Sequence, residues 1–178
     1  REHYKSTIIT YAGIIQSVLR NPNECCGIFS HTRPIAKGFL RQIKAEFEQN
    51  DRLKRIYGDV LWSEPRKQSP KWSEDDGLII KRTQNPKEAT VEAWGLVDGQ
   101  PTGKHFSLLA YDDVVTKESV SNPDMIRKVT ESWELSLNLG AHGGRRWAIG
   151  TRYHANDTYR TMMDRGSVVP RIHSATND

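Results

Sequence analysis

The sequence contains only two cysteines, Cys25 and Cys26, and they are adjacent in the chain. Neighbouring cysteines rarely form a disulfide with one another, and a third cysteine is missing, so we expect neither a disulfide nor a zinc site. The pair lies in a short apolar stretch. We interpret both as reduced strand residues of a protein from a cytoplasmic compartment.

Long apolar segments are also missing. No run approaches the roughly 20 residues of a membrane-spanning helix, and the N-terminus has no signal-peptide pattern. The composition, 36% hydrophobic and 27% charged, is typical of a folded domain, and 178 residues suit one domain. The first residue is not Met and already belongs to a motif, which leads us to expect an N-terminally truncated fragment of a longer protein.

A strong charge imbalance is missing as well. The net charge is +4, and the isoelectric point is about 9.1. This mild excess is compatible with a nucleic-acid or nucleotide partner, but it is too small to indicate one by itself.

Short apolar runs alternate with segments of helical periodicity along the chain. We expect a glycine-rich turn at 140–144 and a last strand beginning within 167–173. The pattern predicts an α/β domain with a mostly parallel sheet flanked by helices, in which ligands bind at the carboxyl ends of the strands. The expected strands cover residues 25–30, 78–80, 90–94, 106–111 and 146–150, and the expected helices begin near residues 5, 34, 123 and 157.

The chain opens with REHYKST, which leads directly into a helical pattern. A lysine at a helix N-terminus is electrostatically unfavourable, because that end carries partial positive charge. A bound phosphate removes the conflict: backbone N–H groups and Lys5 would contact it, and the hydroxyl of Ser6 would hold magnesium. The glycines of the usual phosphate-binding loop are missing, with Tyr4 in the place of one, so a helix cap and a surface lysine are the better explanation of the motif when it is taken alone.

Two acids, Asp112 and Asp113, directly follow the apolar run FSLLAY. Adjacent carboxylates at a partly buried strand end repel each other and lose hydration, and a magnesium ion would compensate for both effects. Successive strand residues point to opposite sides, so one acid could face the metal while the other faces an attacking water. The alternative is an ordinary turn after a strand.

A third candidate, Gly150-Thr151-Arg152, follows the apolar run RWAIG. A hydroxyl and a guanidinium at this position could contact a terminal phosphate, although a capped turn explains them equally well. The chain between Lys5 and Asp112 is long enough for two strand–helix units, and the chain between Asp112 and Thr151 is long enough for one. Phosphate-binding ATPase folds have the same order.

Four segments together resemble the large subunit of tailed-phage terminases: REHYKSTIITYAGIIQ, GIFSHTRPIAKGFLRQIKAEF, HFSLLAYDDVVTKESV and AIGTRYHANDTY. The resemblance extends over nearly the whole chain. It implies a P-loop NTPase (RecA/ASCE-like) domain at residues 1–178. It also implies that the strand before the Walker A loop and the C-terminal nuclease domain are not included.

The resemblance also implies roles for individual residues. Arg1 and Lys5 match the spacing of a variant Walker A motif, in which residues 1–7 (Arg1, Glu2, His3, Tyr4, Lys5, Ser6 and Thr7) would surround the phosphates of ATP. Ser6 and Asp112, the Walker B aspartate, would hold Mg²⁺. Asp113 occupies the position of the catalytic base, which is often glutamate in this family. Gly150, Thr151 and Arg152 match the motif that couples hydrolysis to movement.

The implied function is ATP hydrolysis that drives double-stranded DNA into a viral procapsid, in the cytoplasm of an infected bacterial host. The implied partners are DNA, the portal protein and the terminase small subunit, with the chain itself in a homo-oligomeric ring and no membrane involved. A helicase-like ATPase of the same fold is one alternative. A catalytically inert DNA-binding or assembly fragment is another, because a chain that begins inside its phosphate loop need not turn over ATP.

Overall fold

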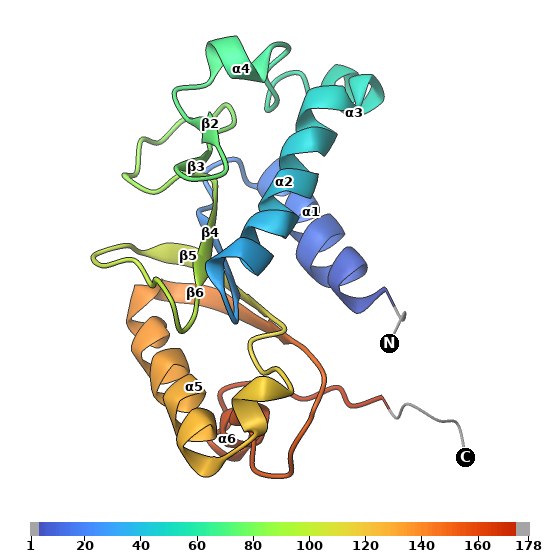
Figure 1. The fold of residues 1–178 in the computed structure, drawn as a ribbon. Helices are drawn as coiled ribbons and strands as arrows, with labels where there is room; N and C mark the ends of the chain where they lie inside the picture. Colours follow the sequence, from blue (N-terminus) through green and yellow to red (C-terminus); the bar gives the residue numbers. More distant parts are fainter. Residues whose placement is uncertain (1–3, 174–178) are drawn as a thin grey trace.

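The computed structural model describes residues 4–173, whose strands form one six-stranded sheet (Figure 1). The strands are β1 (Cys26–Ser30), β2 (Trp72–Ser73), β3 (Gly77–Leu78), β4 (Val91–Gly95), β5 (Phe106–Asp112) and β6 (Gly140–Ile149). Their order is β2-β3-β4-β1-β5-β6. Strands β4, β1, β5 and β6 are parallel, whereas β2 and β3 add a short antiparallel extension beside β4. The predicted α/β class with a mostly parallel sheet is confirmed.

The central strands are largely apolar because both faces of the sheet are covered. Side chains alternate between the faces. In β1, Ile28 belongs to one hydrophobic core and Phe29 to the other. In β5, Ala110 lies in the same core as Ile28, and Tyr111 lies in the same core as Phe29.

The first face is covered by the N-terminal helix and by α2 (Arg33–Gln49). The N-terminal helix starts at Lys5 and consists of a π-helical segment, η1 (Thr7–Ala12), followed by α1 (Gly13–Arg20). Helix α2 packs against β1 and β4 through a stripe at helical spacing, and it has Pro34 in its first turn, where proline is favoured. The stripe consists of Ala36, Leu40, Ile43 and Phe47.

The second face is covered by α5 (Pro123–Ser136) and α6 (Thr158–Asp164), which lie across the sheet from α1 and α2 (Figure 1). Asn122 and Asp157 cap these helices, because their side chains accept backbone N–H groups of the first turns. Two short 3₁₀ segments, η2 (Glu118–Val120) and η3 (Leu137–Leu139), precede and follow α5. Trp133 of α5 and Met162 of α6 are buried in this core.

The segment between α2 and β4 contains α3 (Asp51–Ile56), α4 (Pro65–Gln68) and the β2–β3 hairpin. This hairpin places acids beside the basic side of α2. Lys37 pairs with Asp75, and Arg41 Nη2 lies 2.8 Å from Glu74 Oε2. Part of the positive charge on the basic side of α2 is thus neutralised by acids of the same chain.

Two expectations about the C-terminal part are wrong. Residues 140–144 are not a turn: they form the first half of β6, and the pairing with β5 is irregular between Phe106 and Leu108. The segment 167–173 contains no strand. Within residues 4–173, no helix combines the length and the apolar character needed to cross a membrane.

Candidate functional site

The start of the N-terminal helix meets the carboxyl ends of β5 and β6. Ser6 and Asp112 are 106 residues apart in the sequence, yet the Ser6 hydroxyl donates a hydrogen bond to Asp112 Oδ1 at 2.8 Å. Lys5 Nζ donates to the Gly150 carbonyl oxygen at 3.0 Å and to Thr151 Oγ1 at 3.1 Å. The three sequence motifs therefore occupy one place, at the edge of the sheet where parallel α/β folds bind ligands.

Asp112 is buried and accepts hydrogen bonds on both carboxylate oxygens. Ser6 donates to one oxygen, and Thr10 Oγ1 donates to the other in a short contact. Thr10 is itself fully buried. The sequence interpretation missed Thr10, although its position four residues after Ser6 places it one helical turn further along the same side.

The helix that carries Ser6 and Thr10 is π-helical over Thr7–Ala12: the Gly13 N–H donates to the Ile8 carbonyl, five residues earlier. Single π-helical turns occur frequently at functional sites. Here the π-helical segment lies immediately before α1 and contains Thr10, one of the two residues whose hydroxyl groups contact Asp112, while Ser6 directly precedes it.

The surroundings of Asp112 disfavour the charged form of its carboxyl group. Burial raises the pKa of its carboxyl group, and the neighbouring Asp113 contributes in the same direction. The hydrogen bonds from Thr10 and Ser6 and the charge of Lys5 act in the opposite direction without cancelling the increase. A cation bound at this carboxylate would stabilise its ionised form.

Asp113 is exposed, whereas Asp112 is buried, so the two carboxyl groups lie in different environments. Asp113 has a φ of 47°, in the left-handed region that non-glycine residues rarely adopt. Its N–H donates to the Ile149 carbonyl at 2.9 Å, which connects this turn to the end of β6. Strained backbone of this kind is found preferentially at active sites.

Tyr4, directly before the helix, has a φ of 50°. This is the left-handed conformation that glycine adopts without steric cost, and Tyr4 occupies the position at which the usual phosphate loop has glycine. The loop therefore has a glycine-like backbone without the glycine. Thr7, the third residue of the helix, is exposed. Arg1, Glu2 and His3 lie outside the described residues.

Gly150 and Thr151 lie at the site, but the Arg152 side chain turns away from it. Its Nε lies 3.0 Å from Asp157 Oδ1, and its Nη2 donates to the carbonyl oxygens of His154 and Ala155. In this structure Arg152 thus stabilises the loop before α6. A contact between Arg152 and a phosphate would require these bonds to break.

The residues present fit the magnesium ion that the resemblance implies. Mg²⁺ is usually held by one or two protein oxygen ligands together with substrate phosphates and water, not by a closed protein cage. Ser6 Oγ and Asp112 Oδ1 are adjacent oxygens of this type. Residues 4–173 contain no group of three or more His, Cys, Asp or Glu side chains that could hold a metal by themselves.

Ser30 supplies a further polar group near the same place. Its hydroxyl is buried and has no hydrogen-bond partner within the described part of the chain. Phe29 pairs with Tyr111 in the parallel β1–β5 register, so the next residues, Ser30 and Asp112, are neighbours and point to the same face. A buried hydroxyl without a partner is costly, and an ion with its water shell beside Asp112 would satisfy it.

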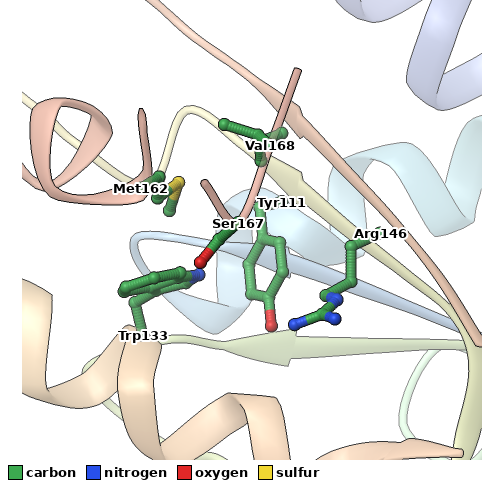
Figure 2. A pocket seen from close by; sticks show the side chains of 7 residues that line it. Tyr111, Trp133, Arg146, Met162, Ser167 and Val168 are labelled. Carbon is green, nitrogen blue, oxygen red and sulfur yellow. The ribbon is translucent and has the colours of Figure 1, made fainter. Parts of the chain in front are cut away.

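A separate small cavity lies on the other face of the sheet, between β5, β6, α5 and α6 (Figure 2). Trp133, Met162 and Val168 form its apolar wall, and the Tyr111 phenol lies beside the Arg146 guanidinium. Its free volume of about 10 Å³ admits roughly one water molecule. This cavity is therefore a packing defect and not a substrate site.

Comparison of the chain with models of protein families and with curated proteins gives no match. The interpretation of the site therefore depends on its geometry and on the sequence motifs.

Proposed function

We propose that the chain is the ATPase motor domain of a tailed-phage terminase large subunit, which hydrolyses ATP to move double-stranded DNA. The observation that supports nucleotide binding is the meeting of Lys5, Ser6, Asp112 and Thr151 at the carboxyl edge of the sheet. The four resembling segments support the DNA-packaging role. The portal protein, the small subunit and a ring of identical subunits are the partners that this proposal implies.

In the proposed mechanism, the backbone N–H groups at the start of the helix and the Lys5 ammonium bind the phosphates of ATP. Ser6 would ligate Mg²⁺, and Asp112 would hold it through water; when bound, the metal neutralises charge on the β and γ phosphates. Asp113 orients a water molecule for in-line attack on the γ-phosphorus and accepts its proton, while the bond from the γ-phosphorus to the bridging oxygen breaks and ADP leaves. The resemblance would assign Arg1, which lies outside the described residues, to the stabilisation of charge on the transferred group.

The bonds of Lys5 suggest how hydrolysis is sensed. Lys5 holds the carbonyl of Gly150 and the hydroxyl of Thr151 in the structure, and a γ-phosphate would compete for the same ammonium group. Release of phosphate would return Lys5 to Thr151. The position of the segment after β6 would then follow the state of the nucleotide.

Isothermal titration with Mg²⁺ and a non-hydrolysable ATP analogue tests the proposal. We expect the chain to bind, and Lys5→Ala and Asp112→Asn to weaken binding at least about tenfold, since each removes a charge-assisted contact. Lys67→Ala is the matched control, because Lys67 is exposed and its ammonium group pairs with Glu64, away from the site. Unchanged affinity in Lys5→Ala would refute the site, and no binding by the wild type would favour an inert assembly module.

Turnover assays separate the two motor hypotheses. A packaging motor contacts mainly backbone phosphates, so DNA should stimulate phosphate release independently of sequence and less at high salt. A helicase-like ATPase would separate strands of a duplex with a single-stranded tail, which a packaging motor would leave intact.

A further inference from the structure

Tyr159 of α6 lies beneath the proposed site, although α6 covers the opposite face of the sheet from the N-terminal helix. Its side chain is buried, and its hydroxyl donates a hydrogen bond to the Ile149 carbonyl at 3.1 Å. The same carbonyl accepts the Asp113 N–H at 2.9 Å. One oxygen atom therefore joins α6, the end of β6 and the turn after β5.

The Tyr159 ring also fixes the position of Gly150. A Cβ atom on Gly150 would lie 2.8 Å from Tyr159 Cε2 and closer still to the hydroxyl oxygen, which is nearer than real Cβ atoms approach. The phenol therefore packs directly against the Gly150 backbone, whose carbonyl oxygen receives the Lys5 ammonium.

Tyr159 also lies near the chain that follows Asp113. Burial and the charges of Asp113 and Asp112 raise the pKa of its phenol, whereas the backbone of Val115 and Val114 acts in the opposite direction. His31 holds the Val114 carbonyl from the other side at 3.0 Å. The His31 bond and the bond from the Asp113 N–H to Ile149 stabilise this turn, in which the left-handed backbone of Asp113 would otherwise be unfavourable.

We propose that Tyr159 is a positioning residue that keeps Asp113 and Gly150–Thr151 in a fixed mutual arrangement and transmits their displacement to α6. The inference rests on the proposed function, because the displacement is the one that nucleotide binding would cause. Gly150 and the Asp113 turn are both in contact with the same phenol, so neither moves far without it.

Displacement of α6 would in turn act on α5. Thr158, the first residue of α6, shares a hydrogen bond of 3.0 Å with Thr130 of α5, and Met162 is buried in the core that contains Trp133. Segment 153–166 would therefore move in response to the nucleotide, although it lies on the face of the sheet that the nucleotide does not touch.

Hydrogen–deuterium exchange of the whole chain, with and without Mg²⁺ and a non-hydrolysable ATP analogue, tests this inference. In the wild type we expect slower exchange both in residues 4–12 and in α6. In Tyr159→Phe, which keeps the ring and loses the hydroxyl, protection of residues 4–12 should persist while protection of α6 falls at least twofold. Tyr111→Phe is the matched control, because its buried hydroxyl bonds to Ser136 at 2.8 Å, away from the site.

The outcomes separate the two proposals. Wild-type exchange that is unchanged by nucleotide in residues 4–12 would overturn the proposed function. Protection of residues 4–12 without protection of α6, or full protection of α6 in Tyr159→Phe, would overturn only the role of Tyr159. In a protein that turns over ATP, Tyr159→Phe should lower kcat about tenfold and leave KM within about twofold, since misaligned catalytic groups slow the chemical step more than binding.

Discussion

Replacement of Gly150 by alanine tests the packing between the site and α6. Gly150 is not among the residues with positive φ, so the backbone tolerates alanine and the cost is purely steric. The added Cβ would overlap the Tyr159 phenol, and over-packing of this kind costs about 1–3 kcal/mol. Displacement of the phenol would also break its bond to Ile149, at about 1 kcal/mol. We therefore expect Gly150→Ala to lower the free energy of unfolding by about 2–4 kcal/mol.

Urea denaturation followed by circular dichroism measures this change, and Gly38→Ala provides the control. Gly38 lies inside α2 with no atom within 4 Å of an added Cβ, so alanine there should stabilise the protein by about 0.5–1 kcal/mol through helix propensity. Opposite signs for the two variants are the expected result. A Gly150→Ala protein as stable as the wild type would refute the contact between Gly150 and Tyr159.

Three further changes probe the surroundings of the site and the fold. Ser30→Ala should raise the unfolding free energy by about 1 kcal/mol without ligand, because it removes an unsatisfied buried hydroxyl. The same change should reduce the rise in Tm that Mg²⁺ and nucleotide produce. Ser119→Ala, which removes a satisfied buried hydroxyl, should instead destabilise the protein. A loss of stability in Ser30→Ala would contradict the assignment. Thr10→Val should weaken binding of the Mg²⁺–ATP analogue about tenfold in calorimetry, whereas Thr10→Ser should bind normally; equal affinities would exclude a role for the hydroxyl. Arg66 lowers the pKa of Glu48 from 4.5 to about 2, so Glu48→Gln should lower the free energy of unfolding by about 1–2 kcal/mol at pH 7. In denaturation curves, this difference between variant and wild type should disappear as the pH falls from about 4.5 to 2. A difference of unchanged size at pH 2 would contradict the ion pair.

Short apolar runs in the sequence were sufficient to predict most of the sheet. Strands such as β1 and β5 are buried on both faces and therefore appear in the sequence as continuous apolar runs. The glycines at 140–144 were misleading, because glycine normally indicates a turn. In this chain they form the irregular start of an edge strand, and a Cβ atom on Gly144 would lie only 2.9 Å from the Ala141 carbonyl oxygen.

The candidate site was predictable only in part. Lys5, Ser6 and Asp112 stand in motifs with recognisable chemistry, and strand ends converge at one edge of a parallel sheet. Ser30 and Tyr159 belong to no motif, since their relation to the site depends on strand register and on the packing of α6. Arg152 looks like a phosphate ligand in the sequence, but the nearby buried Asp157 competes for its charge.

A crystal structure of the chain with Mg²⁺ and a non-hydrolysable ATP analogue tests the central claim most directly. The account predicts that the β and γ phosphates contact Lys5 Nζ and the first turn of the N-terminal helix, with the metal between Ser6 and the Asp112 carboxylate. Phosphates bound elsewhere, with Lys5 still bonded to Gly150 and Thr151, would contradict it.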